Sequence, residues 1–276
     1  MRRRWWAVWT TMAVLTGWNL AIAHDIWITG QPGLYLSQPD TVTVIATVGS
    51  YFPKIEIAIG RDRIGETYWL DPLGNRWPIQ WKVERDRTVA RIEMTAGGHH
   101  VVILTQKPRW IEIPARDFKT YLDHEGLERA IAIWRQSGNV RAPAREVYTR
   151  YIKALFHVAG KQEDTGYTQS LGLRAEIVPL DHPCAGGRVR VRVLFAGRAA
   201  VDQTVLYGTD GRRMRRVKTD DRGVATLQID RAGVWFVKTI DMHHHDPPMS
   251  FGNRGAEWES HWAILTFEVV KRQDRQ

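Results

Sequence analysis

The sequence predicts a mainly β protein with two immunoglobulin-like or transthyretin-like β-sandwich domains and a helical insertion between them. Three observations support this: alternating β-branched segments early in the chain, similar segments late in the chain, and apolar residues at helical spacing between the two. The predicted boundaries are 24–113 for the N-terminal domain, 114–170 for the helical insertion and 171–276 for the C-terminal domain.

Residues 1–23 have the features of a secretory signal peptide. Three arginines at positions 2–4 precede a mostly apolar stretch, and Ala21-Ile22-Ala23 provides a small-residue cleavage site. Cleavage before His24 would release a periplasmic or secreted protein whose first residue is histidine. The alternative is an uncleaved membrane anchor, because the apolar stretch approaches the roughly 20 residues that span a bilayer.

Period-two alternation predicts the strands of the N-terminal domain. Residues 41–48 are rich in β-branched side chains, and residues 55–59 alternate apolar and polar positions. Turn signals at Asp71-Pro72, Gly74-Asn75 and Gly97-Gly98 divide the region into short segments. Several short strands at this spacing are typical of a sandwich.

The periodicity changes in the middle of the chain. Apolar residues recur at helical spacing in segments 115–136 and 144–158. Ser137-Gly138-Asn139 separates the segments, and Pro143 suits the first turn of the second. We therefore predict two helices between the domains. The apolar positions are Leu127, Ile131 and Trp134 in the first segment, and Val147, Tyr151, Leu155 and Val158 in the second.

The C-terminal domain returns to the β pattern. Valines at 189, 191 and 193 alternate with arginines at 188, 190 and 192, which predicts one buried and one solvated face. Segments 233–237 and 262–267 have the composition of the last strands.

Composition and motifs exclude several classes of function. Cys184 is the single cysteine, so no intramolecular disulfide can form. The net charge is +9, but no nucleic-acid recognition motif is present and export argues against a nucleic-acid partner. The chain has no Gly-x-Ser-x-Gly motif, phosphate-binding glycine loop or His-Glu-x-x-His helix, so we expect no enzyme and assign no catalytic residue.

Histidines near the C-terminus predict a metal site. His243, His244 and His245 lie between Asp241 and Asp246, directly after a predicted strand. If the strand continues through this segment, Asp241, His243 and His245 share one face. Imidazole with carboxylate suits Ni, Co, Cu or Zn.

Two further histidines are candidate ligands of the same ion. As a first residue, His24 would offer both its α-amine and its imidazole, and His261 begins the last predicted strand. The predicted metal ligands are therefore His24, Asp241, His243, His245 and His261. Neutral imidazole is the ligating form, so binding should weaken as the pH falls through the histidine range.

The remaining histidines are weaker candidates. His99 and His100 alternate across a predicted strand, so at most one of them faces a given site. Whether His99, His100 or His244 takes part in metal binding stays open. His124 and His157 lie on predicted helices and His182 lies in a linker, which favours structural or surface roles.

Four short segments together resemble a known bacterial family. They are the start His24-Asp25-Ile26-Trp27, Gly49 with the following Tyr51-Phe52-Pro53, Tyr151-Ile152-Lys153-Ala154-Leu155, and Gly172-Leu173 with Glu176-Ile177-Val178-Pro179. The family consists of exported proteins of the domain-of-unknown-function type, described as the periplasmic component of cobalt or nickel uptake systems of the energy-coupling-factor class. The resemblance covers nearly the whole chain after residue 23, and the family start maps onto His24 and Asp25.

The resemblance implies a two-part β-sandwich protein that handles a divalent transition metal outside the cytoplasm. The leading hypothesis is a protein that captures or delivers Ni²⁺, Co²⁺ or Cu²⁺ for a membrane permease complex. Copper is included because Asp241-Met242-His243 is similar to the Asp-x-His of periplasmic copper carriers. The alternatives are a structural or adhesion module without a metal, and an oxidase-like enzyme with a copper histidine brace.

Overall fold

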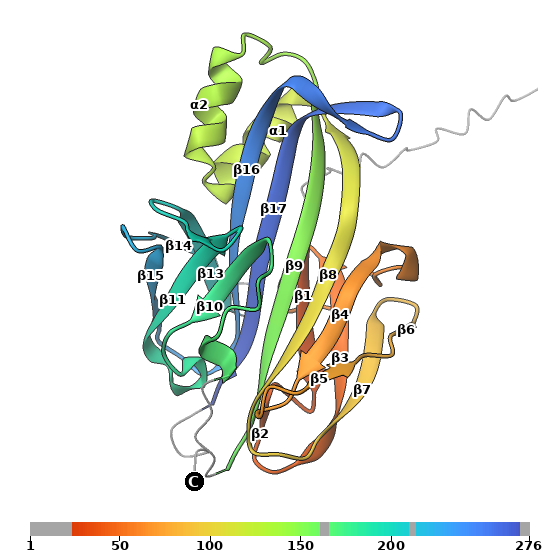
Figure 1. Ribbon diagram of the computed structural model, residues 1–276, viewed down its shortest axis with the longest axis vertical. Helices are drawn as coiled ribbons and strands as arrows, with labels where there is room; N and C mark the ends of the chain where they lie inside the picture. Colours follow the sequence, from red (N-terminus) through yellow and green to blue (C-terminus); the bar gives the residue numbers. More distant parts are fainter. Residues whose placement is uncertain (1–23, 161–165, 210–213, 271–276) are drawn as a thin grey trace, which may run out of the picture.

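A long mixed sheet forms the centre of the protein (Figure 1). The computed structural model describes residues 24–160, 166–209 and 214–270. Residues 1–23 lie outside this part, so the signal peptide stays a prediction. The central sheet has the strand order β14-β13-β16-β17-β9-β8-β4-β5, and β2 pairs with β9 at one end. Its strands are β2 (Tyr35–Leu36), β4 (Ile64–Leu70), β5 (Arg76–Pro78), β8 (Gly98–Ile113), β9 (Ala144–Val158), β13 (Thr204–Thr209), β14 (Arg215–Lys218), β16 (Gly233–Phe251) and β17 (Arg254–Val269).

Each face of the central sheet is covered by a smaller sheet. Even-numbered residues of β16 and β17, such as Phe236 and Ile264, pack against the sheet β1-β3-β7-β6. Odd-numbered residues, such as Val237 and Leu265, pack against the sheet of β10, β11, β12 and β15. The covering strands are β1 (Asp25–Gln31), β3 (Asp40–Gly49), β6 (Lys82–Val83) and β7 (Thr88–Met94) on one face, and β10 (Ala175–Pro179), β11 (Gly187–Phe195), β12 (Arg198–Ala199) and β15 (Val224–Ile229) on the other.

The mainly β class is confirmed, and the two predicted sandwiches share their middle layer. The central sheet takes strands from all three predicted ranges of the chain, because β8, β9 and β17 are neighbours in it. The division into an N-terminal domain, an insertion and a C-terminal domain stays a prediction.

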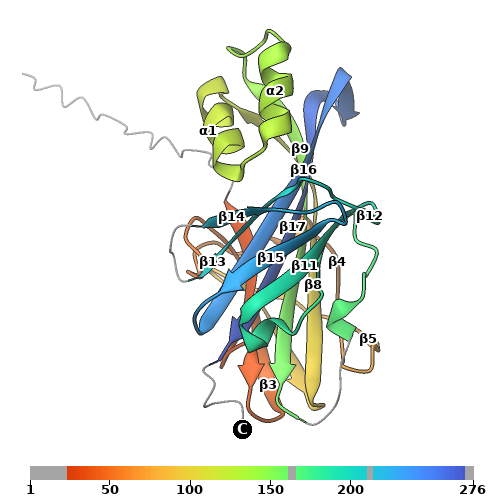
Figure 2. The same cartoon turned by 90° about the vertical axis from the view of Figure 1, so that its left-hand side faces the viewer.

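Helices α1 (Ala115–Glu125) and α2 (Glu128–Gln136) lie together at one end of the sheets (Figures 1 and 2). They confirm the helical prediction for segment 115–136. Gly126 ends α1 at a φ of 68°, a conformation that favours glycine, and Arg216 donates hydrogen bonds to the exposed carbonyls of Asp123 (3.2 Å) and His124 (3.1 Å). Short 3₁₀ turns occur at Arg61–Arg63 (η1), Gly166–Thr168 (η2) and Pro183–Ala185 (η3). Within the described ranges, no helix is long and apolar enough to cross a bilayer.

The second predicted helix is wrong, because segment 144–158 is strand β9. Val147, Tyr151 and Leu155 recur every four residues, and a spacing of four fits one face of a strand as well as a helix. Ile152, Ala154 and Phe156 are buried on the opposite face, so β9 is covered on both sides. It pairs antiparallel with β8 and parallel with β17, which makes it a central strand.

Candidate metal centre

Three histidines from separate elements meet near one end of the central sheet. His99 on β8 and His157 on β9 are directly opposite in the strand register, and His182 precedes η3. Their ring centroids lie 4.6 Å (His99–His157), 4.6 Å (His99–His182) and 5.0 Å (His157–His182) apart. Within the described ranges, these are the three metal-ligating side chains whose ligand atoms all lie within 4.8 Å of one another.

The fold gives this cluster a buried and an open side. His99 is 2% exposed and its ring packs on Tyr167 at 4.1 Å between centroids. His157 is half-buried against Tyr35, while His182 is exposed. His100 lies on the other face of β8 and contacts the Ala96 carbonyl oxygen through Nε2 at 2.9 Å. A metal ion bound by the three imidazoles would therefore approach from the His182 side.

Three imidazoles are a suitable ligand set for a divalent transition metal. Neutral imidazole binds Zn, Cu, Ni and Co, and sites with three protein ligands leave a further coordination position for water or an exchanging group. Because a ligating imidazole must be neutral, affinity should decrease with decreasing pH.

Four of the five predicted ligands lie together elsewhere on the same face of the sheet. Asp241 pairs with His261 and His243 with Glu259 in the β16–β17 register, so these side chains share one face. His243 Nε2 lies 2.9 Å from Asp241 Oδ2. Glu259 contacts His245 Nε2 at 3.2 Å and His261 Nε2 at 3.4 Å.

This second cluster is an ion-pair network rather than a set of converging ligands. Arg174 Nη1 donates to Asp241 Oδ2 at 3.1 Å and brings a positive charge to the centre of the group. The hydrogen bond with Asp241 raises the pKa of His243. Burial lowers the pKa of His261, and Arg174 lowers it further. Each carboxylate is therefore already paired with a cation or an imidazole.

His24 lies on the opposite face of the central sheet. Its carbonyl oxygen accepts a hydrogen bond from Arg150 Nη2 at 2.9 Å, and Arg150 lies over the Trp262 ring at 4.8 Å. Trp262 and His261 are consecutive on β17, so their side chains point to opposite faces. The structure therefore does not bring His24 to Asp241, His243, His245 and His261.

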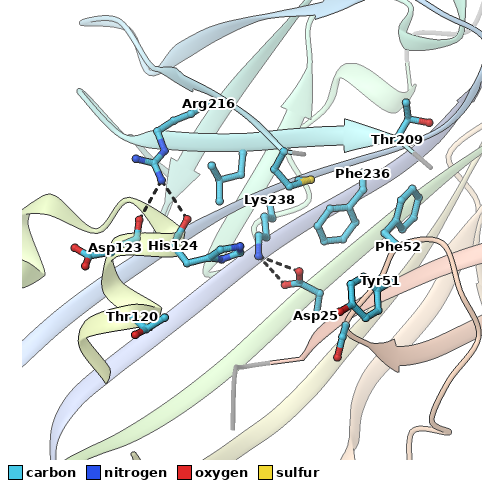
Figure 3. A pocket seen from close by; sticks show the side chains of 13 residues that line it. Asp25, Tyr51, Phe52, Thr120, Asp123, His124, Thr209, Arg216, Phe236 and Lys238 are labelled. Atoms are coloured by element: carbon cyan, nitrogen blue, oxygen red, sulfur yellow. Dashed lines mark hydrogen bonds and ion pairs between the residues drawn. The ribbon is translucent and has the colours of Figure 1, made fainter. Parts of the chain in front are cut away.

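A larger cavity of about 860 Å³ lies beside α1 on the His24 face (Figure 3). Buried Lys238 lines it and contacts two carboxylates, Asp25 at 2.9 Å and Glu125 at 2.8 Å. Burial alone would lower the pKa of Lys238, but Asp25 and Glu125 raise it above its usual value, so the ammonium is charged. His124 Nδ1 lies 2.9 Å from Glu125 Oε1 and extends the network toward solvent.

A family model of proteins described as Domain of unknown function (DUF4198) matches residues 21–242. The chain belongs to the DUF4198 family. No curated protein is similar to it in sequence. Solved structures that align with this DUF4198 chain include the D0-D1 domain of intimin, at 12% identity, a TM-score of 0.21, and coverage of 88% of this chain and 97% of that one. The human OSCAR ligand-binding domain aligns at 14% identity, a TM-score of 0.21, and coverage of 90% and 98%. These likenesses are too slight to carry an argument.

The three-histidine cluster of this DUF4198 chain was not predicted from its sequence. The prediction that His157 lies on a helix is wrong, and this error concealed its pairing with His99 across β8 and β9. His182 comes from a distant loop that no local pattern links to the pair. One indication of the cluster is present in the sequence: His99 and His100 are consecutive in a predicted strand, so their side chains point to opposite faces of the sheet. In the structure, His99 is the one on the face covered by β10 and β11.

Proposed function

We propose that this DUF4198 protein binds one divalent transition-metal ion through His99, His157 and His182. The observation that supports the proposal is that the three ligand atoms lie within 4.8 Å of one another although the residues come from three separate elements. Paired strands hold two of the imidazoles, and the loop before η3 supplies the third. A preformed arrangement of this kind reduces the ordering cost of binding.

The proposed role is to capture or deliver Ni²⁺, Co²⁺ or Cu²⁺ outside the cytoplasm for a membrane permease complex. The signal-peptide pattern of residues 1–23 supports export, and the resemblance described above supports nickel or cobalt as cargo. An all-imidazole site also suits Cu²⁺, which binds nitrogen ligands most tightly in the divalent series. Mass spectrometry of the protein recovered after expression of the full chain would establish whether it begins at His24.

We expect His182→Ala to weaken metal binding at least about tenfold, because it removes one of three ligands. His182 is exposed, so the substitution should leave the fold intact. Calorimetric titration with Ni²⁺, Co²⁺, Cu²⁺ and Zn²⁺, first at pH 7.5 and then at pH 5.5, measures the effect. The unsubstituted protein should bind one ion per chain, and more weakly at the lower pH.

The matched control is His245→Ala, which removes a histidine from the Asp241–His261 cluster. Metal affinity should be unchanged in this variant. Loss of binding in His245→Ala but not in His182→Ala would move the site to the β16–β17 hairpin. If no divalent metal binds or raises the melting temperature, the chain is a structural module, because a ligand specific for the folded state stabilises it by mass action.

A further inference from the structure

Three arginines surround a small cavity on the His24 face of the central sheet. The cavity has a volume of about 250 Å³ and is lined by Arg63 of η1, Arg109 of β8 and Arg150 of β9. Ile57, Ile111 and Trp262 provide apolar walls. It lies on the opposite face from the three-histidine cluster, since Arg150 contacts the ring of Trp262 and His157 belongs to the other face of β9.

Arg150 is the deepest cation of this cavity and keeps one donor unused. The residue is 3% exposed. Its Nη1 donates to Gln106 Oε1 at 2.8 Å and its Nη2 donates to the His24 carbonyl oxygen at 2.9 Å. Its guanidinium carbon lies 4.5 Å from the centroid of the Tyr148 ring and 4.8 Å from that of Trp262. In the described part of the chain, no acceptor is within reach of its buried Nε. A buried donor without an acceptor is costly unless a ligand or water supplies one.

Arg63, which also lines the cavity, has the same feature. Its Nε is buried and has no acceptor among the described residues. Burial lowers the pKa of Arg63, and the positive charges of Arg109 and Arg150 lower it further. Arg109 lies 3.9 Å from Asp62, whose side chain is 78% exposed, so solvent screens this pair. The cavity lining thus carries three guanidinium groups and, among the described residues, a single carboxyl group, that of Glu146.

The carboxyl group that lines the cavity does not fully balance this positive charge. Glu146 is buried, and burial raises its pKa to about 7. Its Oε1 accepts hydrogen bonds from Ser260 Oγ and from Tyr121 Oη, which lie outside the cavity lining. At and below neutral pH a large fraction of Glu146 is uncharged, so its carboxyl group offsets only part of the positive charge of the three guanidinium groups.

We propose that this cavity is a binding site for the carboxylate of a small organic acid with an apolar body. Guanidinium groups bind carboxylates through charge-assisted hydrogen bonds, and two of the three arginines that line the cavity, Arg63 and Arg150, have an Nε without an acceptor among the described residues. The isoleucine and tryptophan walls would receive the apolar body of the acid. The volume is below that of common drug-sized pockets, which favours a ligand of a single ring or short branched chain.

The test uses benzoate as the probe and benzamide as its neutral isostere. Protein recovered from expression of the full chain, without added metal, is titrated with each compound while heat and tryptophan fluorescence are recorded, because Trp262 lines the cavity. Benzoate should bind with one site per chain and benzamide at least about tenfold more weakly. Equal affinities for the two compounds, or no benzoate binding, would overturn the proposal. Binding of inorganic sulfate without benzoate would overturn the apolar part of it.

Arg63→Gln should weaken benzoate binding at least about tenfold, because it removes one of the unused donors and its charge. The control is Arg91→Gln, whose side chain is exposed on β7 and does not line the cavity. Arg150→Gln should abolish binding. If Arg150→Gln does not fold, Arg109→Gln replaces it, with the same direction expected. Benzoate affinity that is unchanged in Arg63→Gln would place the binding elsewhere.

Discussion

Replacing Lys238 with methionine is expected to destabilise the protein by about 3–5 kcal/mol, because it leaves buried carboxylates without their cation. Lys238 is 1% exposed and its ammonium contacts Asp25 and Glu125. Methionine has a similar length, so the loss of packing should be small compared with the loss of charge compensation. Urea unfolding at pH 7, followed by tryptophan fluorescence, measures the difference in unfolding free energy.

Lys218→Met is the matched control for this prediction. Lys218 contacts Glu128 at 2.9 Å, but the Glu128 side chain is 62% exposed. An exposed pair contributes only about 0–1 kcal/mol, so this variant should be close to the unsubstituted protein. Adding Glu125→Gln to Lys238→Met should recover part of the lost stability, because it removes a buried charge. If Lys238→Met and Lys218→Met lower the unfolding free energy equally, the buried Lys238 network contributes no more to stability than an exposed ion pair.

Glu146→Gln is expected to stabilise the protein by about 3 kcal/mol at pH 8.5 and to have little effect at pH 4. Burial raises the pKa of Glu146 from 4.5 to about 7 in the folded protein. Well below pH 4.5 the Glu146 carboxyl is protonated in both the folded and the unfolded protein, so its ionisation does not change the unfolding free energy. As the pH rises from 4.5 through 7, the unfolded chain ionises first, so the unfolding free energy falls. Glutamine keeps the shape of the protonated side chain and cannot ionise.

The measurement is urea unfolding of both proteins at a series of pH values from 4 to 8.5. The difference in unfolding free energy should grow between about pH 4.5 and 7 and then become constant. Glu112→Gln provides the control, because Glu112 is an exposed residue of β8. A difference between Glu146→Gln and the unsubstituted protein that does not change with pH would contradict a raised carboxyl pKa.

Local patterns were sufficient to predict several strands and one of the two helical segments, but the predicted strand 55–59 is wrong, because this segment forms only an isolated β-bridge between Ile57 and Val48. The predicted strand 41–48 lies within β3, and the alternating valines and arginines at 188–193 lie within β11. In both strands part of the length has one buried and one more exposed face. Apolar and polar residues therefore alternate there with a period of two, which is visible in the sequence. Segment 115–136 also has a partly visible period, because Phe118, Tyr121 and Leu122 of α1 and Trp134 of α2 are buried while the charged residues of both helices are mostly exposed.

Segment 144–158 shows why the rest was not predictable from local patterns. A strand covered on both faces has no polar side, and its apolar residues fit several periods. The partners of β9 are β8 and β17, which lie beside it in the sheet but are distant from it in the sequence. His99 and His157 meet only because β8 pairs with β9. The incorrect prediction of a helix over 144–158 therefore concealed His157 as a candidate metal ligand. The Asp241–His261 group was predictable because a single hairpin positions it.

The position of β17 determines when the central sheet can be completed. This strand lies between β16 and β9 but is the last strand of the described chain. Until the ribosome has released residues 254–269, β9 presents an unpaired edge, and such edges invite pairing with other chains. Contacts between segments that are distant in sequence also form slowly. The central sheet is therefore completed only after residues 254–269 become available, and the β9 edge needs protection from other chains until then.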